Sequence, residues 1–221
     1  RAERQVAYGF LRTTLLYVGP AEMQRLVEQF YPRFVRDRLV RTVAAQQGIP
    51  LYRVLASPPA TAAIERLRRQ TLFMGLSDGA RIDIVRHSNV GILTNEQLVV
   101  ATQVDKDKWQ DLRDSQVDKD KWQDLRDSLR GDLKDKTARF SIVYLIDDFM
   151  GTGTSLLRYD EAKTKWKGKL IKFKDSLANA LETLGEGELL EPGWQLCVHH
   201  YIGSKAASDA PDIASGPSTR I

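Results

Sequence analysis

The sequence predicts an α/β protein with a central parallel sheet and an α-helical extension at its N-terminus. Residues 140–146 are large or β-branched apolar residues with the single exception of Ser141, a pattern typical of a parallel strand buried on both faces. Residues 170–184 repeat apolar side chains at helical spacing, and an apolar run at 194–202 follows. A strand, a helix and a second strand in this order indicate a parallel sheet with crossover helices.

Residues 1–74 are expected to form the helical N-terminal region. Apolar residues recur at helical spacing in 6–16 and again in 26–39, and Gly19-Pro20 separates the two runs. Pro32 lies inside the second run and should kink or split that helix. The polar face of this helix carries Arg33, Arg36, Arg38 and Arg41. Such a basic face is more often solvated surface than a nucleic-acid contact.

Residues 75–205 are expected to form the α/β core, and residues 206–221 a flexible tail rich in Ala, Ser, Asp, Gly and Pro. Only two strands are readable, near 141–147 and 194–202. The other strands of a parallel core are therefore either poorly readable before Asp105 or missing because the chain is truncated after Ile221. Residues 80–87 alternate apolar and polar side chains and fit a strand or a helix.

The segment 103–128 consists of two identical copies of QVDKDKWQDLRDS, at 103–115 and 116–128. Structural repeats rarely stay identical over this length, so the duplication is either a recent in-frame event or an error in the recorded sequence. One copy should supply a charged helix with Trp and Leu on one side. The other copy would lengthen that helix or bulge as a surface loop.

Residues 142–155 carry the chemistry and read IVYLIDDFMGTGTS. The buried strand brings Asp147 and Asp148 to its carboxyl end, the edge at which ligands bind in α/β sheets. The loop after it, before a helix expected from Ser155 onward, consists of Gly151, Thr152, Gly153, Thr154 and Ser155. Its amides and hydroxyls can form an anion cradle. Carboxylates beside such a cradle suit a ligand with a phosphate at one end and vicinal hydroxyls at the other, such as ribose 5-phosphate.

Four apolar residues, two acids, two apolar residues and a Gly/Thr loop, in this order, resemble the phosphoribosyl-diphosphate-binding motif of phosphoribosyltransferases. The resemblance implies a phosphoribosyltransferase-like core over 75–205. It also implies that Asp147 and Asp148 hold the ribose hydroxyls and that residues 151–155 bind the 5-phosphate. The implied Mg²⁺ is carried by the diphosphate and the sugar hydroxyls, with no direct protein ligand. Thr154 departs mildly from the motif, which often has glycine or alanine there.

Three further segments, 71–83, 93–99 and 166–173, are similar to a branch of this superfamily found in bacterial conflict and anti-phage loci, including some near reverse transcriptases. Enzymes of the family need a second loop for the diphosphate. The residues nearest to it in order are Ser77, Asp78, Gly79 and Arg81.

Structural interpretations compete with these assignments. The acid pair and the loop could be an ordinary strand-to-helix connection capped by Asp148, and residues 77–79 a plain turn. Lys169 could reach a diphosphate or be surface. A Walker-type loop is disfavoured because no lysine follows the glycines and the GxxxxGK(S/T) spacing is absent. His199 and His200 should point to opposite faces of a strand, which favours a structural role over a metal site.

Three functions remain open. The first is an enzyme that acts on phosphoribosyl diphosphate or a nucleotide, as a nucleotide-targeting effector in anti-phage defence. The second is a non-catalytic nucleotide sensor on the same fold. The third is a nucleic-acid-associated subunit that uses the arginines of 33–41 and the cluster Arg66, Arg68 and Arg69. The helical N-terminal region could dock a partner protein in each case.

The composition of the chain limits its possible partners and its cellular location. A net charge of +4 permits anionic partners without requiring them. Cys197 is the only cysteine, which excludes an intramolecular disulfide and favours a cytoplasmic location. No apolar run reaches the roughly 18–20 residues that span a bilayer, so no membrane partner is expected. The chain opens on Arg1, which leaves an earlier targeting segment open.

Overall fold

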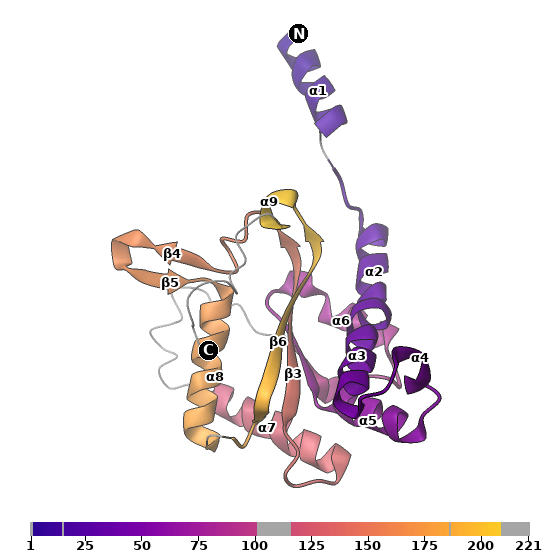
Figure 1. Ribbon diagram of the computed structural model, residues 1–221. Helices are drawn as coiled ribbons and strands as arrows, with labels where there is room; N and C mark the ends of the chain where they lie inside the picture. Colours follow the sequence, from indigo (N-terminus) through magenta and orange to yellow (C-terminus); the bar gives the residue numbers. More distant parts are fainter. Residues whose placement is uncertain (1, 15, 101–115, 186, 209–221) are drawn as a thin grey trace.

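The computed structural model describes residues 2–14, 16–100, 116–185 and 187–208. Its centre is a parallel sheet (Figure 1), in which the strand order is β2-β1-β3-β6. The strands are β1 (Thr71–Gly75), β2 (Leu98–Val100), β3 (Phe140–Met150) and β6 (Leu190–Gly203). This architecture confirms the predicted α/β class and its parallel central sheet.

Helices precede, connect and follow the strands. They are α1 (Ala2–Thr14), α2 (Pro20–Gln29), α3 (Arg36–Gln47), α4 (Leu51–Val54), α5 (Pro58–Arg69), α6 (Ile82–Ser88), α7 (Gln116–Leu133), α8 (Lys169–Leu184) and α9 (Lys205–Ser208). Shorter turns are the π-helical η1 (Phe30–Val35) and the 3-10 turns η2 (Asp78–Ala80), η3 (Asn95–Gln97) and η6 (Glu161–Lys163). A separate antiparallel hairpin joins β4 (Arg158–Asp160) to β5 (Lys165–Lys167).

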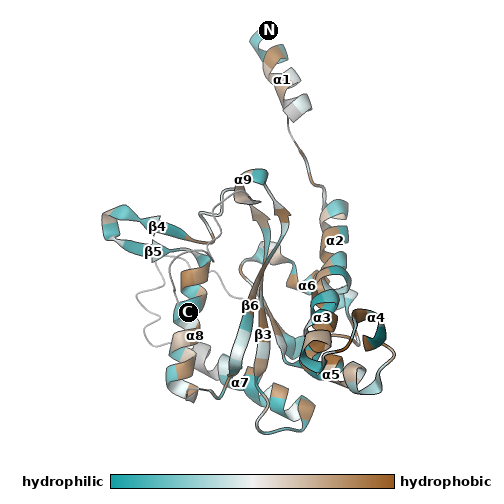
Figure 2. Cartoon of the chain, in the orientation of Figure 1, coloured by the Kyte–Doolittle hydropathy of each residue, from teal (hydrophilic) through white to brown (hydrophobic). Residues whose placement is uncertain are grey.

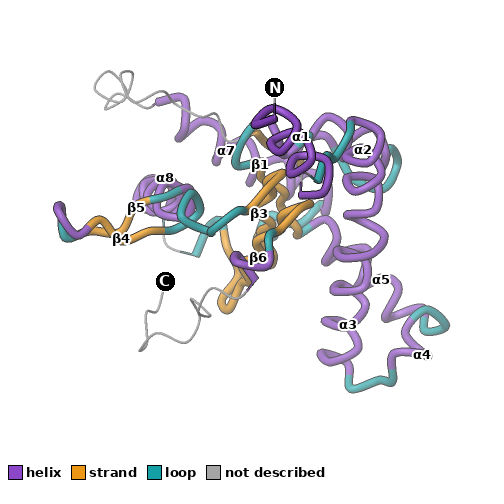
Figure 3. The backbone as a smooth tube through the Cα atoms, turned by 90° about the horizontal axis from the view of Figure 1, so that it is seen from above, coloured by secondary structure: helices purple, strands orange, loops and turns teal. Residues whose placement is uncertain are grey.

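The helices cover the sheet on both faces (Figure 3). On one face, α2, α3, α5 and α6 pack against β3 and β6 through a core that includes Phe30, Leu39 and Tyr144. On the other face, α7 and α8 pack through a core that includes Trp122 and Phe173. β3 lies between these cores and is mainly hydrophobic (Figure 2). Burial on both faces explains its nearly continuous apolar run.

Pro32 splits the long N-terminal helix as predicted. The chain passes from α2 to α3 through the π-helical turn η1, in which Phe30 and Val35 are buried. Proline has no amide hydrogen and its ring crowds the carbonyl of the preceding turn, and a widened turn relieves both problems. α1 stands away from the rest of the chain, and Val6 and Phe10 on it are largely exposed.

The sheet begins earlier than the sequence indicated. The predicted boundary between 74 and 75 falls inside β1, which lies between β2 and β3. The helices before β1 pack on the sheet, so residues 20–74 share one core with the later strands. β1 and β2 are the strands that could not be read before Asp105. Residues 80–87, which fitted a strand or a helix, lie mostly in α6.

The second copy of the duplicated segment forms most of α7. Its Trp122 and Leu125 are buried against the sheet, as expected of one copy. The first copy, 103–115, lies outside the described residues. Of the expected tail, residues up to Ser208 belong to α9 and residues 209–221 lie outside the described residues.

Candidate functional site

The predicted site lies at the carboxyl edge of the sheet, between the adjacent strands β1 and β3. After β1 the chain turns to α6 on one face of the sheet, and after β3 it leads to α8 on the other face. Two neighbouring parallel strands whose connections leave in opposite directions form a topological switch point, where α/β proteins bind ligands. β1 ends with Gly75 beside Ile146, so Asp147 and Asp148 extend beyond it and meet the loop after β1.

Asp147 is almost fully buried, with 2% of its surface exposed. One of its carboxylate oxygens accepts a hydrogen bond from Ser77 Oγ and the other from Lys169 Nζ. Lys169 is the first residue of α8, and 22% of its side-chain surface is exposed. A buried carboxylate needs such partners because an unpaired charge is strongly disfavoured away from water. Asp147 therefore ties the loop after β1 and the start of α8 to β3.

Asp148 is half-buried and points to the other side of β3. Its Oδ1 accepts a hydrogen bond of 2.8 Å from the amide of Phe149. The carboxylate also lies directly against Gly79, where an added Cβ would overlap Asp148 Oδ2. Glycine at position 79 thus lets the loop approach this carboxylate. Of the two acids, Asp148 is the one with surface left for a ligand.

The loop at 151–155 presents polar groups to solvent. Thr152, Thr154 and Ser155 are exposed, and the hydroxyls of Thr152 and Thr154 lie 3.0 Å apart. Gly153 has φ of +79°, a conformation that favours glycine. In the part of the chain that the structure describes, the amides of 151–155 donate to no protein acceptor. Unused amides in a tight loop form a concavity for anions.

The predicted second loop is only partly joined to this site. Ser77 and Gly79 contact the acid pair, as described above. Asp78 and Arg81 are exposed, and no hydrogen bond or ion pair among the described residues links either of them to Asp147 or Asp148. The amides of 77–79 likewise donate to no acceptor among the described residues. A second set of unused donors therefore lies next to the acid pair.

The helix expected from Ser155 onward does not begin there. A single turn, closed by bonds of 3.0 Å from the amides of Leu156 and Leu157 to Gly153 O, leads into the hairpin of β4 and β5, and α8 starts at Lys169. The amide of Lys169 then bonds to Ser155 O at 3.1 Å, as if the helix resumed after an insertion. The predicted anion cradle is therefore a loop, without the helix N-terminus that the sequence suggested. The sequence sign of this hairpin is the alternation of polar and aromatic residues around Tyr159 and around Trp166, which is typical of short strands.

The two histidines of β6 lie on opposite faces, as predicted. The His199 ring packs on Phe30 and Phe34 with centroids 4.6 and 4.8 Å apart, and burial lowers its pKa to about 4. His200 pairs with Asp147 in the strand register, and burial lowers its pKa as well. His200 is a neighbour of the acid pair that the sequence could not identify, because the strand register was unknown.

The two predicted arginine clusters, one in 33–41 and one in 66–69, differ in how far their charges are neutralised by ion pairs. Arg66, Arg68 and Arg69 form ion pairs with Asp135, Glu65 and Asp132. The hydrogen bond from Arg66 holds the pKa of Asp135 well below its usual range. This cluster is therefore largely neutralised within the chain. Arg33, Arg38 and Arg41 instead line an open groove.

Comparison with protein-family models, curated proteins and solved structures gave no match. Within the described residues, no three His, Cys, Asp or Glu side chains gather as they would around a metal ion. No described helix has the length and apolar character needed to cross a bilayer. The assignment of the site therefore rests on its own residues.

Proposed function

We propose that the carboxyl edge of β1 and β3 binds a ribose-5-phosphate ligand, either phosphoribosyl diphosphate or a nucleotide. The observation that carries the proposal is the position of the acid pair at the switch point, where the bond from Ser77 to Asp147 attaches the predicted second loop to β3 and the loop at 151–155 follows the end of the same strand. Each loop has amides that donate to no acceptor among the described residues, and Asp148 contacts Gly79 of the second loop and keeps part of its surface free.

The two carboxylates take different roles in this proposal. Asp148 accepts hydrogen bonds from the ribose hydroxyls, because it is the half-exposed member of the pair. Asp147 is a positioning residue that holds Ser77 and Lys169. The loop at 151–155 binds the 5-phosphate through its amides and hydroxyls. The amides of 77–79 and the side chain of Arg81 face the diphosphate. This division refines the resemblance, in which both acids hold the hydroxyls.

The reaction that such a site supports is displacement at the anomeric carbon of the ribose. The bond from this carbon to the diphosphate oxygen breaks, the diphosphate leaves with the electron pair, and a nucleophilic nitrogen of the acceptor forms the new bond and then loses its proton to solvent. Positive charge develops on the sugar ring in the transition state. The nearby Asp148 carboxylate stabilises that charge, while the two loops fix the phosphates in place.

A magnesium ion suits this site only as a companion of the ligand. Because Asp147 is already paired, Asp148 is the carboxylate that could contact the ion, and the diphosphate and hydroxyl oxygens would supply the other ligands. The ion would offset the negative charge of the departing diphosphate.

Calorimetric titration of phosphoribosyl diphosphate with Mg²⁺ into the full chain tests the proposal. We expect micromolar binding that weakens at least tenfold in Asp148→Asn, because a charge-assisted hydrogen bond contributes about 1.5–3 kcal/mol. Asp124→Asn, which removes an exposed carboxylate from α7, is the charge-matched control and should bind normally. Absence of binding by folded wild type, or equal binding by Asp148→Asn, would overturn the proposal.

A second measurement separates the enzyme from the sensor. The bound protein is incubated with phosphoribosyl diphosphate and a mixture of nucleobases, and released diphosphate is measured. Release that depends on a base identifies a transferase. Binding without release favours the non-catalytic nucleotide sensor.

A further inference from the structure

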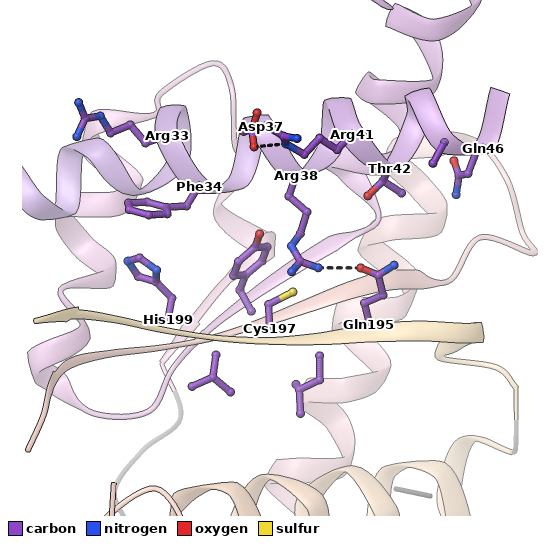
Figure 4. Close-up of a pocket in the computed structure, with 14 residues that line it drawn as sticks. Arg33, Phe34, Asp37, Arg38, Arg41, Thr42, Gln46, Gln195, Cys197 and His199 are labelled. Atoms are coloured by element: carbon purple, nitrogen blue, oxygen red, sulfur yellow. Dashed lines mark hydrogen bonds and ion pairs between the residues drawn. The ribbon is translucent and has the colours of Figure 1, made fainter. Parts of the chain in front are cut away.

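An open groove lies between the N-terminal helices and the edge of the sheet, away from the switch point (Figure 4). It encloses about 870 Å³. Its upper wall is η1 and α3, and its floor is β6. Tyr144 of β3 also lines it. Arg38 reaches across the groove and donates a hydrogen bond of 2.9 Å to Gln195 Oε1.

The floor of the groove is an edge strand. β6 pairs with β3 on one side, and the other side has no strand partner in the described ranges. Residues 194–203 of this strand contain no Lys, Arg, Asp or Glu, and Val198 is 40% exposed. Proteins usually protect long edge strands with charges or a covering element, because an open row of amides and carbonyls invites another strand. The edge of β6 therefore has the properties of a docking site for an extended segment.

The wall above this edge is positively charged. Arg33, Arg38 and Arg41 line the groove, and Asp37 is its single acidic residue. Asp37 is already paired with Arg41 at 2.6 Å. Within the described part of the chain, no ion pair involves Arg33 or Arg38. The groove thus offers at least two uncompensated cations to a segment that lies along β6.

The charge argues against a second copy of the chain as the occupant. Two copies joined through antiparallel β6 strands would be related by a twofold axis perpendicular to the sheet. That axis keeps both α3 helices on the same face of the joined sheet, so the arginines of one copy would approach those of the other. An occupant with negative charges would pair with the arginines of the wall, and its free strand edge would pair with the edge of β6.

We propose that this groove binds an extended acidic peptide segment of a partner protein, which adds to the edge of β6 as a further strand. Side chains alternate along a strand, so every second residue of the peptide faces α3. Acidic residues at those positions meet Arg33, Arg38 and Arg41, while main-chain hydrogen bonds to β6 supply affinity that does not depend on sequence. The groove is thus a defined surface for the partner protein that the sequence led us to expect on the N-terminal helices. This proposal does not depend on the ribose-phosphate site.

The probe for this surface is a fluorescein-labelled decapeptide of alternating Glu and Val, titrated into the full chain and followed by anisotropy. We expect saturable binding that weakens at least tenfold in Arg33→Gln/Arg38→Gln, which corresponds to about 1.4 kcal/mol. The control Arg12→Gln/Arg25→Gln removes the same charge from exposed positions outside the groove and should bind like wild type. A decapeptide of alternating Lys and Val should not bind.

Hydrogen exchange distinguishes strand addition from loose electrostatic contact. Bound peptide should slow exchange of amides within 195–199, and the slowing should be absent in Arg33→Gln/Arg38→Gln. The inference is wrong if the acidic peptide does not bind, if it binds without protecting β6, or if a ten-nucleotide oligothymidylate binds the same arginines more tightly. A dimer in sedimentation that Val198→Lys disrupts would likewise overturn it in favour of a second copy.

Discussion

Asp147 and Lys169 form the ion pair at the base of the candidate site, and only the lysine touches solvent appreciably. Replacing Lys169 with Met leaves a buried carboxylate without its cation. We expect the free energy of unfolding to fall by about 2–3 kcal/mol, somewhat below the 3–5 kcal/mol typical of fully buried pairs. Urea denaturation measures the change. Lys174→Met, at an exposed position of the same helix, is the control and should lose less than about 0.5 kcal/mol.

Gly79 tests the position of Asp148. The backbone at this residue does not require glycine, but a methyl group would overlap the Asp148 carboxylate. Gly79→Ala should therefore displace Asp148 and weaken phosphoribosyl-diphosphate binding about tenfold, at a stability cost of about 1–3 kcal/mol. Gly131→Ala provides the comparison, because nothing lies within 4 Å of an added Cβ there. Unchanged affinity in Gly79→Ala would show that the contact with Asp148 is not needed for binding.

His199 makes stability depend on pH. Burial lowers its pKa from 6.5 to about 4 in the folded chain, so the unfolded chain binds the proton first as pH falls. The contribution of neutral His199 is complete above about pH 6.5 and is lost as pH drops toward 4, by on the order of 2 kcal/mol. Urea unfolding at pH 7 and pH 4.5 measures this loss. His199→Phe, which keeps the packing on Phe30 and Phe34, should flatten the dependence.

At the residue scale, the acid pair and the two loops could be selected from the sequence as candidate site residues, but the separate role of each acid could not be predicted. Asp147 and Asp148 follow a readable buried strand, and the glycines beside them mark the loop. Nothing in the local pattern shows that Ser77 covers Asp147 and leaves Asp148 accessible. That difference follows from the pairing of β1 with β3, which joins segments about seventy residues apart.

At the scale of elements, the hairpin between the loop and α8 has the properties of an insertion. The two ends of the hairpin meet where the amide of Lys169 donates a hydrogen bond to Ser155 O. Beside it, Gly168 has a φ of +133° and lies so close to the backbone of Leu156 that a Cβ there would overlap it. Replacing residues 158–167 with two glycines should keep α8 and change the free energy of unfolding by about 1 kcal/mol or less. Circular dichroism and urea denaturation check this, and loss of cooperative unfolding would contradict it.

The strands that could not be predicted from the sequence are short. β1 spans Thr71–Gly75 and follows α5 almost directly, with no glycine or proline to mark the change. β2 spans Leu98–Val100, which is too short to display a period of two. The long elements were predictable because α8 and β3 are long enough for their apolar patterns to repeat.

At the scale of the whole molecule, the duplication can be tested by removing one copy. The copies are identical and adjacent, so deleting 103–115 or 116–128 yields the same chain. The remaining copy still supplies the buried Trp and Leu that α7 packs against the sheet. We expect the free energy of unfolding to stay within about 1 kcal/mol of the original, because the buried residues of α7 are retained and the length of a connection affects the free energy only weakly. Trp122→Ala in the full chain, by contrast, should cost about 3–5 kcal/mol.

The overall class was predictable, whereas the strand order was not. A buried strand, a long amphipathic helix and a second apolar run are enough to indicate a parallel α/β sheet. The order β2-β1-β3-β6 depends on long-range pairing that leaves no local pattern. The switch point between β1 and β3 is a property of that order, so it emerges only in the folded chain.

The core that joins the first helices to the last strand bears on how the chain folds during synthesis. Val27 and Phe30 of the N-terminal helices pack in one cluster with Cys197 and Tyr201 of β6. The ribosome makes the helices long before it makes their partners. Their apolar stripe therefore stays without its final cover until β6 has emerged. A nascent chain in this state is a natural client for chaperones that shield apolar helices.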